Sequence, residues 1–259
     1  MILTLDAGNS RLSCGIFLED KMIFSFGCET KEICEKQFCD FLSTKLNENG
    51  ILQNQISAIG FCSVVPAINQ IVKNACLKLF NKEPLLLTAD VKTGLKINYE
   101  NANKLGSDRI AAAIGAICLQ SERKNLIVVD MGTATTVDAI SKNSEFMGGA
   151  ILPGIKLMVK ALSGGTAQLP PIELFEPQNA CGNSTQTCIR SGIFYGALGG
   201  IRELILRYTK ETFHNEKPVV IATGGFSKLF ETQNIFDFIE ENLVLLGLKK
   251  IILSHSLTK

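Results

Sequence analysis

The chain has 259 residues, of which 46% are hydrophobic and 20% are charged, so it can bury a substantial core in two domains of ordinary size. The formal net charge is only +1 and no dense block of Lys and Arg occurs, which argues against a nucleic-acid surface and favours small-molecule chemistry. The apolar runs are too short to cross a bilayer and the N-terminus lacks the features of a signal peptide, so we expect a cytoplasmic protein without membrane contact.

The N-terminal half alternates predicted strands and helices, a pattern typical of an α/β layer. Apolar runs between turn residues predict strands, and apolar residues at helical spacing predict helices. The small, apolar run Ile110–Ala116 predicts a helix packed tightly against a sheet. The other elements expected here, in chain order, are strands Ile2–Leu5, Leu12–Phe17 and Met22–Gly27, a helix Lys31–Leu46, a strand Ala58–Val65, a helix Ala67–Phe80 and a strand Leu85–Thr88.

The C-terminal half repeats this scheme. Residues 164–187 are rich in Gly, Pro, Thr, Asn and Gln without periodicity, which predicts a long loop, and loops of that length are usually functional or mobile. An amphipathic stretch, Phe236–Leu246, closes the domain. The remaining expected elements are strands Leu126–Asp130, Thr136–Ser141 and Phe146–Leu152, a helix Ile155–Leu162, a helix Cys188–Phe213 and a strand Val219–Thr223.

Cysteine and histidine usage gives no sign of a zinc site or a Ser/His/Asp triad. His214 and His255 lie far apart, and the cysteines contain no C-x-x-C pair and are odd in number. We therefore expect reduced, mostly buried cysteines. There are nine, Cys14, Cys28, Cys34, Cys39, Cys62, Cys76, Cys118, Cys181 and Cys188.

One phosphate-binding pattern occurs twice, once in each half. An apolar strand runs into Asp6-Ala7-Gly8-Asn9-Ser10, and a second runs into Asp130-Met131-Gly132-Thr133-Ala134-Thr135-Thr136; each returns as another strand. Glycine permits a sharp turn and a close approach to a ligand, hydroxyls donate hydrogen bonds, and an aspartate can hold a cation beside phosphate. A single copy would favour an ordinary hairpin turn, but two copies favour a nucleotide clamp.

Five motifs in this order resemble type III pantothenate kinase over nearly the whole chain. The resemblance implies the actin-like ATPase fold of acetate and sugar kinases, Hsp70 and actin: two related, ribonuclease H-like α/β domains, 1–115 and 116–259, with ATP in the cleft between them. It also implies transfer of the ATP γ-phosphoryl group to pantothenate, which opens coenzyme A synthesis. The motifs are Asp6–Ser10, Gly106–Arg109, Asp130–Thr136, Gly148–Gly154 and Thr223–Gly225.

The resemblance assigns the nucleotide and its cations to both halves. Backbone N–H groups of Gly8 and Asn9 and the hydroxyl of Ser10, where the family usually has threonine, are expected at phosphate oxygens. Asp6 would orient hydrated Mg²⁺, and Asp130, otherwise read as a turn-former, would bind a monovalent cation, K⁺ or NH₄⁺. The full ATP set is Asp6, Ala7, Gly8, Asn9, Ser10, Arg11, Leu12, Ser13, Thr133 and the adenine-site pair Gly224 and Gly225, which also fits a simple strand-to-helix turn.

Asp108 is the expected catalytic base, accepting the proton of the substrate hydroxyl. Arg109 would bind the carboxylate of pantothenate through two hydrogen bonds. The competing interpretation has Asp108 capping the following helix and Arg109 in a surface ion pair. By resemblance, the substrate set is Tyr99, Gly106, Ser107, Asp108, Arg109 and Thr185, and Ser184 replaces Thr185 if the loop is shifted by one residue.

Members of this family are homodimers, so a homodimer is expected. The runs Ile110–Ala116 and Gly192–Gly200 suit close packing between subunits, but they equally suit a monomer core. Two alternatives to pantothenate kinase remain: a kinase of the same superfamily with another small hydroxyl substrate, and a non-catalytic transcription accessory relative. Retention of Asp6, Asp108, Asp130 and Thr133 argues against the second.

Overall fold

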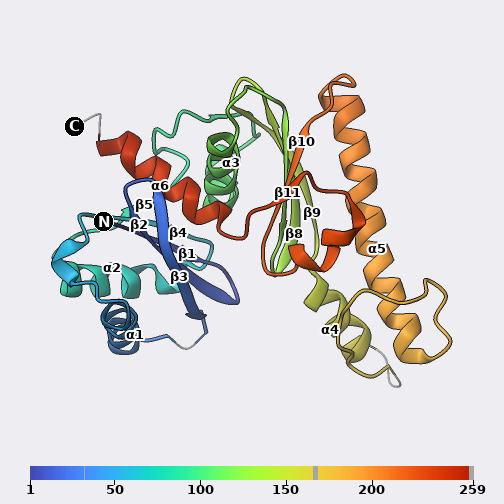
Figure 1. Cartoon of the computed structure of the whole chain (residues 1–259), viewed down its shortest axis with the longest axis horizontal. Coiled ribbons are helices and arrows are strands. Elements are labelled where there is room, and N and C mark those ends of the chain that lie inside the picture. Colours follow the sequence, from blue (N-terminus) through green and yellow to red (C-terminus); the bar gives the residue numbers. More distant parts are fainter. Residues whose placement is uncertain (32, 166–168, 257–259) are drawn as a thin grey trace. The chain divides into compact units, whose positions relative to one another are not determined.

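The computed structural model describes residues 1–31, 33–165 and 169–256 (Figure 1). They form two compact units. Unit 1 comprises residues 1–95, 99–121 and the chain from Asn242 onward, and unit 2 comprises Lys96–Asn98 and Glu122–Glu241. The expected domains were 1–115 and 116–259. The units have other bounds, because the segment from Asn242 onward belongs to unit 1. No helix in the described part of the chain is long and apolar enough to cross a membrane.

Unit 1 is a five-stranded sheet of order β3-β2-β1-β4-β5 with helices on both faces (Figure 1). The odd-numbered residues of β1, including Leu3 and Leu5, point into a core shared with α1 and α2. Helices α6 and α3 cover the opposite face. The elements are β1 (Ile2–Ala7), β2 (Arg11–Leu18), β3 (Lys21–Glu29), α1 (Glu35–Glu48), η1 (Gln53–Gln55), β4 (Ala58–Ser63), α2 (Pro66–Phe80), β5 (Leu85–Leu86), η2 (Ala102–Lys104), α3 (Ser107–Leu119) and α6 (Leu243–Ser256).

Unit 2 is a six-stranded sheet of order β11-β10-β7-β8-β9-β6. Alternate residues of β7, including Ile127 and Val129, pack with α5 and η4 in its core. The elements are β6 (Lys96–Ile97), β7 (Leu126–Met131), β8 (Ala134–Ser141), β9 (Glu145–Pro153), α4 (Ile155–Gly165), α5 (Thr185–Arg207), the π-helical turn η3 (Tyr208–Thr212), β10 (Val219–Thr223), η4 (Ser227–Gln233) and β11 (Phe238–Ile239).

The two sheets share one topology. In unit 1, β1 pairs antiparallel with β2 and parallel with β4; in unit 2, β7 pairs antiparallel with β8 and parallel with β10. Each unit therefore contains an antiparallel meander of three strands, β1-β2-β3 or β7-β8-β9, with parallel strands on the other side of β1 or β7; unit 2 also has the short β6 beside β9. The prediction of two related α/β domains is confirmed.

Three predicted elements differ from the structure. The stretch Phe236–Leu246 is not one element, because it pairs as β11 beside β10 and then enters α6, which continues to Ser256. Helix α1 begins at Glu35 rather than Lys31, and residue 32 of that prediction lies outside the described residues. The predicted loop 164–187 is shortened at both ends by α4 and α5, and its residues 166–168 also lie outside the described residues.

The small-residue run Ile110–Ala116 lies in α3, which packs chiefly on α6 and also contacts β4 of the sheet. A β-carbon at Gly247 of α6 would collide with the carbonyl group of Ala111, and one at Gly115 would collide with the backbone of Leu243. Small residues are needed here because the two helices approach closely within unit 1. The run therefore belongs to the core of one chain, which removes it as a subunit contact.

Candidate active site

The first phosphate loop is a tight turn between β1 and β2. The N–H of Gly8 donates to the carbonyl oxygen of Arg11 at 3.0 Å and so closes the turn; its contact with phosphate stays a prediction. Thr30 braces the loop, because its hydroxyl donates to the Gly8 carbonyl at 2.7 Å and its N–H donates to the Ser10 carbonyl at 3.2 Å. Asn9 and Ser10 are exposed at the tip.

The flanking residues of this loop differ in what they can offer a nucleotide. Ala7 and Leu12 have no exposed surface and belong to the core of unit 1, so only their backbone is left for such a contact. Arg11 is exposed, and Ser13 lies opposite Asp6 on β2. The loop therefore presents Asp6, Asn9, Ser10 and Arg11 as its polar side chains.

Asp6 and Asp108 form an acidic pair in unit 1. Asp6 lies on the face of β1 opposite to the Leu3 and Leu5 core, which is the face that α3 and α6 cover. Burial raises the pKa of Asp6 to about 7, against a lowering by a hydrogen bond from Cys62, and the negative charge of Asp108 raises it further. Burial likewise raises the pKa of Asp108. Two carboxylates with raised pKa values favour a nearby cation.

The start of α3 holds Asp108 in place. Ser107 joins α3 to the end of β4, since its hydroxyl accepts the N–H of Ser63 and donates to the Ser63 carbonyl, both at 3.1 Å. Oδ1 of Asp108 accepts the N–H of Arg109 at 2.8 Å. A β-carbon at Gly106 would collide with this carboxylate, so a larger residue there would displace the side chain of Asp108. Asp108 thus makes a hydrogen bond to the backbone at the start of α3 and also belongs to the acidic pair with Asp6.

Arg109 lies beneath Tyr99. Its side chain is only 8% exposed, which rules out the surface ion pair, and its guanidinium carbon lies 5.9 Å from the centre of the Tyr99 ring. Tyr99 is 37% exposed. A cation against an aromatic face is stabilised, and the planar fork of an arginine suits a carboxylate ligand. The structure therefore brings together the predicted substrate residues of unit 1.

In unit 2 the second phosphate loop repeats the first. Asp130 lies at the end of β7, between Thr136 of β8 and Thr223 of β10, and the N–H of Gly132 closes the turn by donating to the Ala134 carbonyl at 3.0 Å. Thr133 is exposed at the tip, as Ser10 is in the first loop. A glycine N–H thus closes the turn in both units, although it bonds the residue three positions ahead in the first loop and two positions ahead in the second.

Two glycines pack against this second loop. Gly224 has a φ of +86°, and a β-carbon there would lie 2.5 Å from Oδ1 of Asp130. Gly154 lies against the carbonyl groups of Gly132 and Thr133, with no room for a side chain. Gly224 therefore sits at the predicted turn and also against Asp130. Gly225 is exposed, and the space around its α-carbon is open.

Thr185 is the first residue of α5 and is exposed. Ser184, its alternative, caps this helix: its hydroxyl accepts the N–H of Thr187 at 3.3 Å, and its own N–H donates to the Thr187 hydroxyl at 2.9 Å. The capping role occupies Ser184 and leaves Thr185 the better candidate for a ligand contact.

Sequence reasoning missed Thr30 and Cys62, which lie outside the motifs. Their contacts depend on pairing between remote segments. All nine cysteines are free, as predicted, but the expectation that most are buried is wrong, because Cys34, Cys118, Cys181 and Cys188 are exposed. Across the described residues, no group of three or more His, Cys, Asp or Glu side chains is arranged to hold a metal ion.

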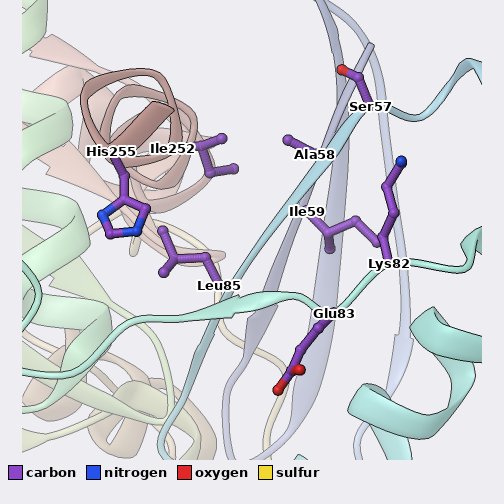
Figure 2. A pocket seen from close by; sticks show the side chains of 8 residues that line it. All are labelled: Ser57, Ala58, Ile59, Lys82, Glu83, Leu85, Ile252 and His255. Carbon is purple, nitrogen blue, oxygen red and sulfur yellow. The ribbon is translucent and has the colours of Figure 1, made fainter. Parts of the chain in front are cut away.

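A separate groove of about 310 Å³ lies at the opposite end of β4 from Cys62 (Figure 2). Ile252 and His255 of α6 face Leu85 across it in the figure. Ligands of α/β sheets bind at the carboxyl ends of strands, where Asp6 lies, and not at this end. The groove is lined by Ser57, Ala58, Ile59, Lys82, Glu83, Leu85, Ile252 and His255.

The family model for type III pantothenate kinase matches residues 2–207. The chain belongs to the type III pantothenate kinase family. It is therefore an enzyme, an ATP-binding kinase that phosphorylates pantothenate in coenzyme A biosynthesis. A type III pantothenate kinase of Legionella pneumophila strain Corby is 43% identical over 249 residues, which are 96% of this chain and 97% of the relative.

Two solved structures share the fold. One, from Campylobacter jejuni and described as a member of the Baf family of transcriptional activators, has a TM-score of 0.62 and 24% identity, covering 98% of both chains. The other, MreB 5 of Spiroplasma citri bound to AMPPNP, has a TM-score of 0.58 and 9% identity, covering 99% of this chain and 97% of that one. At these identities the likeness shows the actin-like fold alone, as predicted.

Proposed function

We propose that Asp108 is the base of this pantothenate kinase, accepting the proton of the pantothenate primary hydroxyl as that oxygen bonds to the γ-phosphorus of ATP. The observation that supports this best is the pairing of Asp108 with Asp6 beside a buried arginine. Burial raises the pKa of Asp108, and a base is most effective when its pKa lies near the working pH. The Arg109 N–H, which lowers the same pKa, helps to keep the carboxylate ionised.

Asp6 would orient hydrated Mg²⁺ on the ATP phosphates. The residues fit this ion, because Mg²⁺ keeps several waters and takes only one or two carboxylates, and no cage of three acidic ligands occurs in the described residues. The pKa of Asp6 is raised because burial disfavours its negative charge. A bound cation would stabilise that charge. Magnesium supplies charge neutralisation to the transferring phosphoryl group.

The first loop would bind phosphate through the exposed Asn9 and Ser10, with Arg11 beside them, and the second loop through Thr133. Asp130 would bind K⁺ or NH₄⁺. A backbone hydrogen bond from Gly132 to Ala134 closes the second turn beside Asp130. Gly224 packs directly on this carboxylate, which links the cation ligand to the expected adenine site.

Arg109 would bind the carboxylate of pantothenate, with Tyr99 covering the guanidinium and Thr185 contacting the same substrate. The position of the guanidinium carbon 5.9 Å from the centre of the Tyr99 ring supports this, because the planar fork of an arginine held against an aromatic ring suits a carboxylate ligand. The substrates are those of intracellular metabolism, and a cytoplasmic location is part of the proposal.

A homodimer is also proposed. On α5, β-carbons placed at Gly192, Gly196 and Gly199 would meet no atom within 4 Å, so this face is not packed against the rest of the described chain. Small residues allow helices to approach closely, and a second copy would cover the open face.

The decisive experiment is ADP formation by the purified protein with Mg-ATP, with and without pantothenate, in sodium, potassium and ammonium buffers. We expect turnover that requires pantothenate and is much faster in potassium or ammonium. Equal turnover in all three salts would remove Asp130 from its role. Turnover independent of pantothenate would contradict the assignment of the substrate.

A further inference from the structure

Cys62 lies beside the acidic pair. Strands β1 and β4 are parallel with Asp6 opposite Cys62, and the thiol donates a hydrogen bond to Oδ1 of Asp6, with Sγ 3.2 Å from that oxygen. Cys62 has no exposed surface. None of the sequence motifs includes it, and the proposed mechanism has not used it.

The contact is more than the packing of a small apolar side chain. The neighbouring Phe61 points into the α1 and α2 core, so Cys62 points to the other face of the sheet, where Asp6 and α3 lie. A thiol is a weak donor that adds no charge. It can therefore fix the orientation of the Asp6 carboxylate while leaving its negative charge available to a cation, which a Lys or Arg at this position would neutralise.

The end of β4 holds both acidic residues at once. Cys62 bonds the Asp6 side chain, and the next residue, Ser63, exchanges two hydrogen bonds with Ser107, which directly precedes Asp108. Two successive residues thus set the positions of the proposed magnesium-orienting carboxylate and of the proposed base.

We propose that Cys62 is a positioning residue for phosphoryl transfer, whose thiol holds the Asp6 carboxylate in the orientation that hydrated Mg²⁺ on ATP requires. This inference rests on the proposed role of Asp6. Groups that orient a metal-binding carboxylate typically contribute about 10- to 100-fold to affinity or activity.

The test compares four variants. Cys62→Ala removes the donor, Cys62→Val removes it while retaining bulk, and Cys62→Ser retains a donor. Cys76→Ala truncates another fully buried cysteine of unit 1, on α2, and controls for lost packing. The readouts are the Kd of Mg-ATP and of metal-free ATP by calorimetry, kcat and KM, and the thermal unfolding midpoint.

We expect Cys62→Ala and Cys62→Val to weaken Mg-ATP binding by about tenfold and to change metal-free ATP binding much less, as lost orientation of a metal-binding carboxylate predicts. Cys62→Ser should recover most of the affinity. Cys76→Ala should lower the unfolding midpoint without changing either Kd.

Two results would overturn the inference. If Cys62→Ser binds Mg-ATP as poorly as Cys62→Val, or if the Cys62 variants resemble Cys76→Ala, the thiol is only a packing group. Asp6→Asn separates this failure from that of the proposed function: if Asp6→Asn itself leaves Mg-ATP binding intact, the role of Asp6 is wrong and the inference fails with it. If Asp6→Asn weakens binding and Cys62→Val does not, the inference alone fails.

Discussion

At the residue scale, the two aspartates of the acidic pair have different surroundings. Asp6 and Asp108 both have a raised pKa, but Asp6 is bonded by a neutral thiol and Asp108 by the N–H of its own helix. The thiol leaves the charge of Asp6 free to attract a cation, whereas the position of Asp108 at the opening of α3 beside Arg109 suits a proton acceptor. Environment, more than residue type, separates their proposed roles.

Asp108→Asn should lower kcat by about 10²- to 10⁴-fold, the usual contribution of general-base catalysis, because shape is conserved while the proton acceptor is lost. The unfolding midpoint should change little. Asp40→Asn, at an exposed residue of α1, is the matched control and should retain full activity. A kcat for Asp108→Asn within a few-fold of the parent would remove Asp108 from the role of base.

The pH dependence of stability should reveal Asp6. Its pKa is about 7 in the folded chain and near 3.8 in the unfolded chain, so the folded state binds more protons and the free energy of unfolding falls as the pH rises from about 4 to about 7. In the ligand-free protein, Asp6→Asn should therefore gain stability relative to the parent at pH 8, by at most about 4 kcal/mol at roughly 1.4 kcal/mol per pKa unit. The difference should shrink toward pH 4.

Denaturant unfolding of both proteins at several pH values measures this difference. Asp40→Asn serves again as the control and should track the parent at every pH. Parallel stability curves for the parent and Asp6→Asn would mean that the carboxylate of Asp6 is not disfavoured by burial.

At the element scale, the last helix of the chain completes the first unit. Helix α6 packs on β1, β4 and α3, on the face of the sheet to which Asp6 and Cys62 point. Gly15 and Gly60 allow its approach to the sheet, since β-carbons there would lie 3.2 Å from Leu245 and 2.6 Å from Ile252. A site built from the N-terminal motifs thus depends on residues at the far end of the sequence.

Gly247→Ala should destabilise the protein by about 1–3 kcal/mol, the usual cost of overpacking, because the new methyl group would collide with the Ala111 carbonyl. The matched control is Gly164→Ala in α4, where a β-carbon meets no atom within 4 Å and the better helix propensity of alanine should stabilise. Denaturant titration measures both. A Gly247→Ala protein as stable as the parent would show that α3 and α6 can separate without cost.

At the scale of the whole molecule, the same strand pairing occurs in both units, and it places a glycine-containing loop after β1 and after β7. Each loop follows the first strand of its antiparallel meander, β1 or β7, and is closed by a hydrogen bond from a glycine N–H, that of Gly8 or Gly132. The loops differ in what braces them, Thr30 in unit 1 and Gly154 in unit 2. Both units therefore share the glycine hydrogen bond that closes the loop, but different residues pack against or bond to the loop.

Sedimentation at micromolar concentration should show a homodimer. Gly196→Glu should shift the protein toward monomer, because a charged side chain would occupy the open face of α5. Gln70→Glu, a comparable change on the exposed surface of α2, should leave the dimer intact. A parent protein that sediments as a monomer would contradict the proposed assembly.

The sequence by itself determined the family and the fold class, because the motifs Asp6–Ser10, Gly106–Arg109 and Asp130–Thr136 are local and keep their order. It also located most strands and helices, since periodicity is a local signal. The tertiary structure decided what depends on remote pairing. The parallel register of β1 and β4 placed Cys62 against Asp6 across 56 positions, and helix packing returned α6 to unit 1. Register and packing are set by the burial of whole sheet and helix faces, which no short stretch of sequence records.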